Sequence, residues 1–261
     1  MTVNELIARF GEQHVAAFVL VLARISPLFV LAPLFSSKLV TARVRGIVAV
    51  GLAIGIAPVA SKGVTLPLGV YDLFWLVLKE MLVGATFAFA IGALFAALST
   101  AGSFLDTSIG FSYGSLVDPL TGSQSSVLAQ AYGLVGTLVF IAIGGDAWVV
   151  QGLARTYDLV GLEQAPDLGR LISSVDSVFG AIFTSALEVA GPVMLALILT
   201  DAAFGVVSRV VPQLNVFAVG FPAKVVVGLL LVAATLPFVA NWISGELQQD
   251  VGAALQAIRV S

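Results

Sequence analysis

The sequence predicts an all-α, polytopic membrane protein with about six long, kinked helical segments. Of its 261 residues, 59% are hydrophobic and only 10% are charged, whereas a soluble domain usually carries roughly a quarter of its residues as Asp, Glu, Lys or Arg. Several apolar stretches also reach the roughly twenty residues that a helix needs to cross a bilayer core about 30 Å thick. These observations exclude a soluble globular fold.

Six apolar segments predict the helices. In chain order they cover residues 15–35, 44–60, 66–98, 127–150, 181–204 and 216–243. The third is longer than a bilayer needs and carries Lys79 and Glu80, so we expect it to tilt, to break or to project beyond the hydrocarbon. Because the sequence shows no internal repeat and no long soluble insertion, we expect one compact unit.

Six prolines in the first, second, fifth and sixth segments are relevant here, because each proline removes a backbone donor and strains the preceding turn. We therefore expect kinked or broken helices. At membrane depth such breaks are tolerated only where protein or a wet cavity satisfies the freed carbonyls, which predicts a lumen or a dense protein interface. The prolines are Pro27, Pro33, Pro58, Pro192, Pro222 and Pro237.

Two segments carry small residues at the spacing of a packing face. Gly51 and Gly55 form a GxxxG pattern in the second segment. In the third segment, small residues recur every four positions, at Gly84, Ala88, Gly92 and Ala96. Such faces let helix backbones approach closely in a membrane. We expect tight packing at both faces, either within the chain or against partners.

Four ionisable side chains fall inside apolar segments and are candidate functional residues by position: Arg24, Glu188, Asp201 and Lys224. If the last two segments form an antiparallel hairpin centred near residue 210, Asp201 is offset from Lys224 by about 7 Å along the axis and Glu188 by about 12 Å. We therefore expect Lys224 to pair with Asp201, which leaves Glu188 for Arg24 or for another subunit. A structural ion pair is favoured over a proton or ion relay.

Residues 99–126 form the least membrane-like region. They include eight Ser, three Thr and four Gly, but no Lys, Arg or Glu. Large apolar side chains are spread through the same region, which is unusual for a loop left in water. We expect a loop buried in protein, or folded into a lumen as an apolar constriction that closes a pore. The candidate side chains are Leu105, Ile109, Phe111, Tyr113, Leu116 and Val117.

Composition excludes several other functions. The net charge is −3 and no basic tract is present, so nothing suits a nucleic-acid backbone. The chain has no cysteine and one histidine, His14, which leaves no thiolate or histidine cluster for a metal ion. We expect no cofactor. His14 is also poorly placed for a catalytic triad, so we expect no enzyme.

The turn between the last two segments is specific. Its residues, Pro212, Gln213 and Asn215 followed by Gly220, Phe221, Pro222 and Lys224, resemble the corresponding turn of the FliR family of flagellar and type III secretion export-gate proteins. Arg24-Ile25, residues 32–35, Arg43 and Arg45 agree with that resemblance, as does Asp118-Pro119. It covers essentially the whole chain. One departure is Gly145-Asp146, where many relatives are expected to carry a Gly-His pair.

The resemblance implies one subunit of a core export gate, assembled with several FliP-like and FliQ-like subunits and contacted by a FlhB-like protein. Unfolded export substrates would leave the cytoplasm through this gate, in the bacterial inner membrane at the flagellar basal body. Residues 1–180 would be a FliP-like helical part that includes a central plug loop, residues 105–122. Residues 181–261 would be a FliQ-like helical hairpin and tail.

Two other classes stay open. A secondary transporter with a midplane charged site would also have broken helices and buried charges, although no paired interrupted segments occur in matching halves. An intramembrane enzyme would need a nucleophile beside a base, which a single peripheral histidine does not supply. Either protein should be stable alone, whereas a gate subunit should require its partners.

Overall fold

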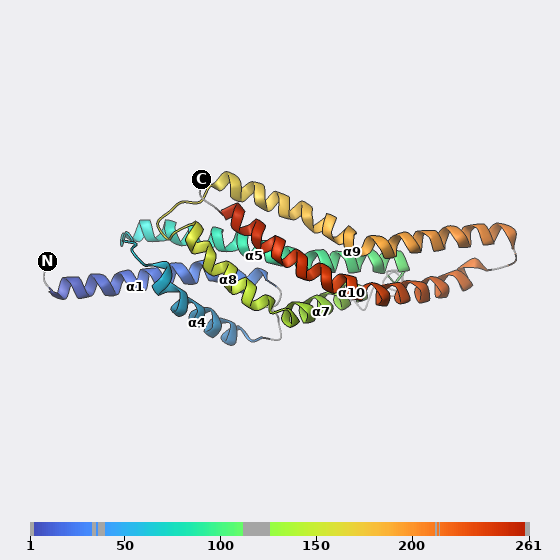
Figure 1. The fold of residues 1–261 in the computed structure, drawn as a ribbon, viewed down its shortest axis with the longest axis horizontal. Helices are drawn as coiled ribbons and strands as arrows, with labels where there is room; N and C mark the ends of the chain where they lie inside the picture. The colour runs from blue at the N-terminus through green and yellow to red at the C-terminus, as the bar shows by residue number, and fades with distance from the viewer. Residues whose placement is uncertain are drawn as a thin grey trace, which may run out of the picture. The chain divides into compact units, whose positions relative to one another are not determined.

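The computed structural model describes residues 3–32, 35, 40–111, 126–211, 213 and 215–258. All regular secondary structure within these residues is helical, which confirms the predicted all-α class (Figure 1). The helices are α1 (Val3–Ile25), α2 (Leu28–Leu31), α4 (Ala42–Ala60), α5 (Val70–Ile109), α7 (Val127–Ala142), α8 (Gly145–Leu159), α9 (Leu168–Val210) and α10 (Val216–Ile258).

Five of the described helical segments are long and apolar enough to cross a membrane. The pair α7 and α8, bent by 73° at a short break, makes a sixth if it counts as one span. This agrees with the predicted number of spans. Gly144, with φ of 70°, occupies the break, where a left-handed conformation favours glycine.

The long helices extend well beyond the apolar segments. Helix α5 has 40 residues, and α9 and α10 have 43 each, so each is about 60 Å long at 1.5 Å per residue. That is roughly twice the hydrocarbon thickness. Of the expected outcomes for the third segment, a break is wrong, because α5 is continuous; tilt or projection beyond the hydrocarbon stays a prediction.

Proline effects differ between the helices. Pro27 separates α1 from α2, which confirms a broken first segment. Pro58, Pro192, Pro222 and Pro237 lie inside helices that continue past them. Pro33 lies outside the described residues.

The described chain divides into two compact units, not the single unit predicted. One comprises Met1–Ala93, Gly144–Phe179 and Leu247–Ser261, and the other comprises Leu94–Ile143 and Gly180–Glu246. Helices α5, α9 and α10 each contribute to both units. Each unit is therefore built from distant stretches of sequence, which explains why no boundary is visible along the chain.

In the first unit, α4 packs against α1 and buries Ala49, Ala53 and Ala57. These alanines recur every four residues and form the contact face of α4. Gly51 and Gly55 belong to the opposite, exposed face, and a β-carbon at either would meet nothing within 4 Å. Within the part of the chain that the structure describes, the predicted GxxxG seam is thus not used for packing.

The second unit joins the C-terminal part of α5 to α7. A β-carbon at Gly102 would lie 2.6 Å from the carbonyl oxygen of Leu128, and one at Gly136 would lie 2.5 Å from Cδ1 of Leu98. The rings of Phe95 and Phe140 pack with their centroids 5.5 Å apart. Glycine at two positions therefore allows these helices to approach closely.

Candidate functional site

Arg24 is the centre of a buried polar cluster in the first unit. Its guanidinium group forms a two-point ion pair with Glu80 of α5, through Nε to Oε2 and through Nη2 to Oε1 at 2.9 Å. Both side chains are fully buried. Nη1 also donates to the hydroxyl of Thr156 at 3.2 Å, and the guanidinium lies 4.1 Å from the ring centroid of Tyr157. One arginine therefore connects α1, α5 and α8.

Lys79 extends the cluster to the end of α8. Its ammonium group lies 2.8 Å from Glu80 and donates to the carbonyl oxygens of Leu162 at 2.6 Å and Gly161 at 3.3 Å. Arg24 donates to the preceding carbonyl, that of Val160, at 2.9 Å. Two cations thus satisfy three successive carbonyls at a helix C-terminus, where the helix dipole favours positive charge.

Of the two partners expected for Glu188, Arg24 or another subunit, Arg24 is wrong. Glu80 is the carboxylate partner of Arg24, while Glu188 accepts a hydrogen bond from Nε1 of Trp242 at 3.3 Å. The sequence shows Glu80 inside an apolar segment, but the adjacent Lys79 offers an apparent local partner for it. Nothing in the sequence fixes the register of helices 56 residues apart.

The small-residue face predicted on the third segment is confirmed. A β-carbon at Gly84 would overlap the carbonyl oxygen of Arg24, and one at Gly92 would lie 3.0 Å from that of Leu31. Ala88 between them is fully buried. The backbone around the α1–α2 break therefore lies directly on α5, which positions Arg24 against Glu80.

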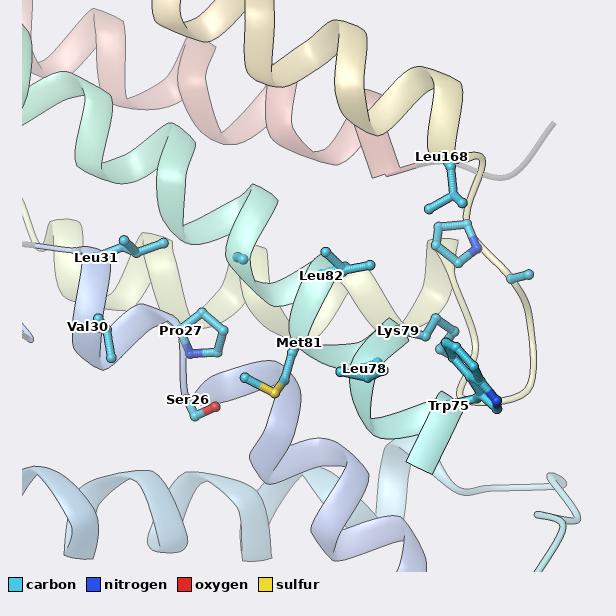
Figure 2. A pocket seen from close by; sticks show the side chains of 13 residues that line it. Ser26, Pro27, Val30, Leu31, Trp75, Leu78, Lys79, Met81, Leu82 and Leu168 are labelled. Carbon is cyan, nitrogen blue, oxygen red and sulfur yellow. The ribbon is translucent and has the colours of Figure 1, made fainter. Parts of the chain in front are cut away.

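An apolar groove of about 740 Å³ lies beside this contact. Figure 2 shows Trp75, Lys79 and Leu168 at one end and Val30 and Leu31 at the other. The ammonium of Lys79 is already used by Glu80 and two carbonyls. The groove therefore offers apolar surface and no unused cation at that end.

The second unit contains the predicted ion pair of the last hairpin. Nζ of Lys224 donates to Oδ2 of Asp201 at 2.6 Å, which confirms the pairing and its register. The Asp201 side chain is 55% exposed and that of Lys224 is 19% exposed. The pair thus connects α9 to α10 while more than half of the Asp201 side chain stays exposed.

The structure describes three of the four residues of the hairpin-turn motif. The side chain of Asn215 accepts a hydrogen bond from the amide of Ala218 at 3.1 Å, as an N-cap residue does at the start of a helix. Gln213 is exposed, and Pro222 lies inside α10. Pro212 lies outside the described residues.

The predicted loop begins later than the sequence indicated. Helix α5 continues through residues 99–109, and hydroxyl groups within it bond to carbonyls four residues earlier, from Ser103 to Ser99 at 3.0 Å and from Thr107 to Ser103 at 2.9 Å. These bonds satisfy the hydroxyl groups of Ser and Thr inside a helix. The high Ser and Thr content of residues 99–109 therefore did not indicate a loop, as the composition had suggested. Leu105 and Ile109 are consequently helical and fully buried, so they are not side chains of a loop.

The connection between α5 and α7, residues 110–126, is held at both ends. Gly110, with φ of 105°, ends α5, and the amides of Gly110 and Phe111 both donate to the carbonyl of Asp106 at 3.0 Å. At the other end Ser126 caps α7 by accepting from Ala129 at 3.0 Å. Oδ1 of the buried Asp106 lies 3.4 Å from the amide of Leu128. The two ends are therefore fastened to each other.

The structure describes only one of the remaining plug candidates. Phe111 is the last described residue before the gap and is partly buried. Tyr113, Leu116 and Val117 lie outside the described residues, so their role stays a prediction.

Together these features define a class: an all-α polytopic membrane protein whose buried charges are paired and whose Ser- and Gly-rich α5–α7 connection is held at both ends. Within the described residues, no group of three or more His, Asp or Glu side chains is arranged to hold a metal ion.

Comparison with known proteins identifies the family. A family model described as "Bacterial export proteins, family 1" matches residues 15–249. The flagellar biosynthetic protein FliR of Bacillus subtilis (strain 168) is 34% identical over 231 residues, which cover 85% of this chain and 88% of the relative. FliR of Escherichia coli (strain K12) is 29% identical over 219 residues, 84% of each chain.

The surface presentation of antigens protein SpaR of Shigella flexneri is 27% identical over 226 residues, which cover 85% of this chain and 87% of the relative. The chain belongs to the FliR family of bacterial export proteins and is a membrane component of a type III export apparatus. This family consists of export-apparatus components rather than enzymes.

Proposed function

We propose that this chain is a gate subunit of the flagellar type III export apparatus, located in the bacterial inner membrane at the basal body. It forms the channel for unfolded export substrates with FliP-like and FliQ-like subunits, and a FlhB-like protein contacts it. The flagellar assignment is supported by 34% identity to a flagellar biosynthetic protein, compared with 26–29% to three surface presentation of antigens proteins.

The observation that carries the gate assignment is the α5–α7 connection. Its residues 112–125 combine Ser and Gly with Tyr113, Leu116 and Val117, and its two ends are fastened through Asp106. Glycine lowers the cost of moving a backbone, and apolar side chains can close a pore by dewetting it. A tethered segment of this composition can seal a lumen and still swing aside.

The exposed surface supports a partner requirement. Large apolar side chains are exposed on all the long helices, among them Ile47 at 71%, Ile172 at 72% and Leu230 at 66%. The face of α4 with Gly51 and Gly55 is open to close helix approach. We assign these surfaces to FliP-like and FliQ-like neighbours. The division into a FliP-like part, residues 1–180, and a FliQ-like part, residues 181–261, belongs to the same proposal.

The transporter alternative gains no support. Arg24 and Glu80 pair with each other, and so do Asp201 and Lys224, while Glu188 accepts a hydrogen bond from Trp242. A midplane site for a transported ion needs charges that a substrate can engage, and these pairs are already formed.

The experiment replaces the apolar side chains without shortening the chain. We define the polar-connection variant as Tyr113→Ser, Leu116→Ser and Val117→Ser, with Ser112→Ala, Ser115→Ala and Thr121→Ala as the matched control. Each is coexpressed with FliP-like and FliQ-like chains. We expect both variants to copurify with the partners and only the polar-connection variant to make cells leak small solutes. Assembly without a leak would refute the seal, and stable behaviour of the chain without partners would refute the gate subunit.

A further inference from the structure

The apolar groove beside the contact of α1 with α5 adjoins a second, more polar hollow. The groove is lined by α5, by the α1–α2 region and by the start of α9. The hollow, of about 350 Å³, shares Trp75 and Lys79 with the groove and adds the carboxylates of Asp72 and Glu163. Because Trp75 and Lys79 both lie at one end of the groove (Figure 2), the two spaces form one site with an apolar part and a charged part.

Aromatic side chains indicate the membrane depth of the charged part. Tyr71, Phe74 and Trp75 are exposed in the first turns of α5, and exposed aromatic residues of this kind gather where a bilayer meets water. From Trp75 the groove follows α5 to Ala85, a rise of about 15 Å. That is about half the thickness of the hydrocarbon core, which is the depth occupied by the acyl chains of one leaflet. The groove therefore has the length and the lining that suit one acyl chain.

The charges of the site follow the order of the groups in a phospholipid. Where the two spaces meet, Lys79 belongs to the buried cluster with Arg24 and Glu80, and two cations with one carboxylate leave a net positive charge there. In the adjoining hollow, Asp72 and Glu163 are exposed. Within the described residues neither of them forms an ion pair. A phosphate therefore suits the junction, and a cation suits the two carboxylates beyond it.

We propose that this site binds a phospholipid whose headgroup carries a primary ammonium, as an ethanolamine headgroup does. One acyl chain lies in the groove, the phosphate lies near Lys79, and the ammonium lies beside Asp72 and Glu163. A primary ammonium has three N–H donors for carboxylate acceptors, whereas the trimethylammonium of a choline headgroup has none. A glycerol headgroup carries no cation, so the two carboxylates would repel the negative charge of its phospholipid. Binding of the ethanolamine lipid does not depend on the proposed gate function.

Photolabelling of the assembled complex tests both parts of the site. The full chain, copurified with FliP-like and FliQ-like partners, is reconstituted into vesicles of choline phospholipid. Each vesicle preparation contains the same small fraction of a probe phospholipid with a photoreactive acyl chain and an ethanolamine, choline or glycerol headgroup. Mass spectrometry then measures labelling of the α5 segment from Trp75 to Ala85, which separates this site from lipid bound elsewhere on the complex.

In the parent complex, the ethanolamine probe should label this segment about fivefold more than either other probe, because exposed charge pairs are individually weak but two of them act together here. The ring introduced by Ala85→Phe would fill the groove, so labelling by the ethanolamine probe should fall by a similar factor. The matched control is Ala154→Phe, at an exposed alanine of α8 that does not line the site. It should leave the labelling unchanged.

Neutralising the carboxylates tests the headgroup part separately. The double variant Asp72→Asn with Glu163→Gln should assemble normally, because both side chains are exposed, and should lose the preference for the ethanolamine probe. The matched control is Asp158→Asn with Asp176→Asn, at two exposed carboxylates of the same compact unit that do not line the site. This control should keep the preference.

Equal labelling by the three probes in the parent complex would overturn the proposal, and so would an ethanolamine preference that survives the loss of both carboxylates. Unchanged labelling in Ala85→Phe would place the probe outside the groove and overturn it as well. If Ala85→Phe prevents assembly, the carboxylate variant decides instead. No labelling of the segment in the parent complex would mean that a neighbouring subunit, and not a lipid, covers the groove, which also refutes the site.

Discussion

At the residue scale, Arg24 shows how this chain keeps a charge inside apolar surroundings. A lone buried guanidinium would be costly, but this one has a two-point carboxylate partner, a carbonyl, a hydroxyl and an aromatic face. Removing one member of a buried ion pair leaves the other uncompensated, which usually costs about 3–5 kcal/mol. We regard the cluster as a structural junction of α1, α5 and α8.

Replacing Arg24 should therefore be severe even when the charge is kept. Lysine cannot reproduce the forked geometry or the stacking of a guanidinium, so we expect Arg24→Lys to lower the melting temperature of the purified complex nearly as much as Arg24→Ala. The control is Arg170→Ala, because Arg170 forms a pair with Asp167 at 3.4 Å in which both side chains are over 40% exposed, and such pairs contribute little. Equal melting temperatures for Arg24→Lys and the parent would contradict the assigned geometry.

The Asp201–Lys224 pair was predictable, whereas the Arg24–Glu80 pair was not. Consecutive helices joined by a short turn fix their own register, so counting residues from the turn was enough for the first pair. Arg24 and Glu80 lie on helices whose register depends on the packing of Gly84, which only the structure reveals. The N-capping role of Asn215 could have been predicted from its residue type at a helix start.

A charge exchange tests the hairpin pair. Asp201→Lys places two cations together and removes the partner of Lys224, so we expect reduced copurification with partners. The exchanged double variant, Asp201→Lys with Lys224→Asp, should recover part of the yield because the two residues share one interaction. If the double variant is no better than Asp201→Lys, the pair does not act as a unit.

At the element scale, small residues on the long helices let neighbouring backbones approach closely. Gly84 and Gly92 admit the backbone of the α1–α2 region, and Gly102 admits that of α7. The four-residue spacing made the α5 face predictable. The exposed face of α4 has the same small-residue spacing, but none of the described residues packs on Gly51 or Gly55. A sequence pattern predicts close approach without specifying the partner.

Substituting alanine for glycine should reduce stability only where the glycine contacts another helix. In Gly84→Ala the added methyl would overlap backbone atoms of Arg24, and a backbone cannot move aside as a side chain can. Overpacking typically costs about 1–3 kcal/mol, and we expect the loss of stability to lie at the upper end of that range. Gly191→Ala is the matched control, since nothing lies within 4 Å of its added β-carbon. Thermal melting that is the same for both variants would refute the close contact of α1 with α5.

The extent of α5 shows where composition fails at this scale. Ser and Thr in residues 99–109 predicted a loop, but their hydroxyls bond within the helix and the opposite face buries Leu105 and Ile109. The spacing of the apolar residues indicates a helix: they recur every three or four positions, at Leu98, Ala101, Leu105 and Ile109. The composition of the whole window obscured it.

At the scale of the whole molecule, the number of apolar helices and the family were accessible from the sequence, but the division into units was not. Each compact unit is assembled from separate stretches of chain, and the shared helices are about twice the bilayer thickness. Spans of this length with exposed apolar faces suit an assembly whose subunits cover one another. This agrees with membership in an export apparatus.

The most direct test of the gate is the conductance of the purified complex in a planar bilayer, since no other cellular channel contributes there. The account predicts low conductance for the parent complex and for the Ser112→Ala, Ser115→Ala and Thr121→Ala control. It predicts conductance at least about tenfold higher for the polar-connection variant, because removal of an apolar seal allows the pore to fill with water. Equal conductance in all three complexes, at equal subunit content, would contradict it.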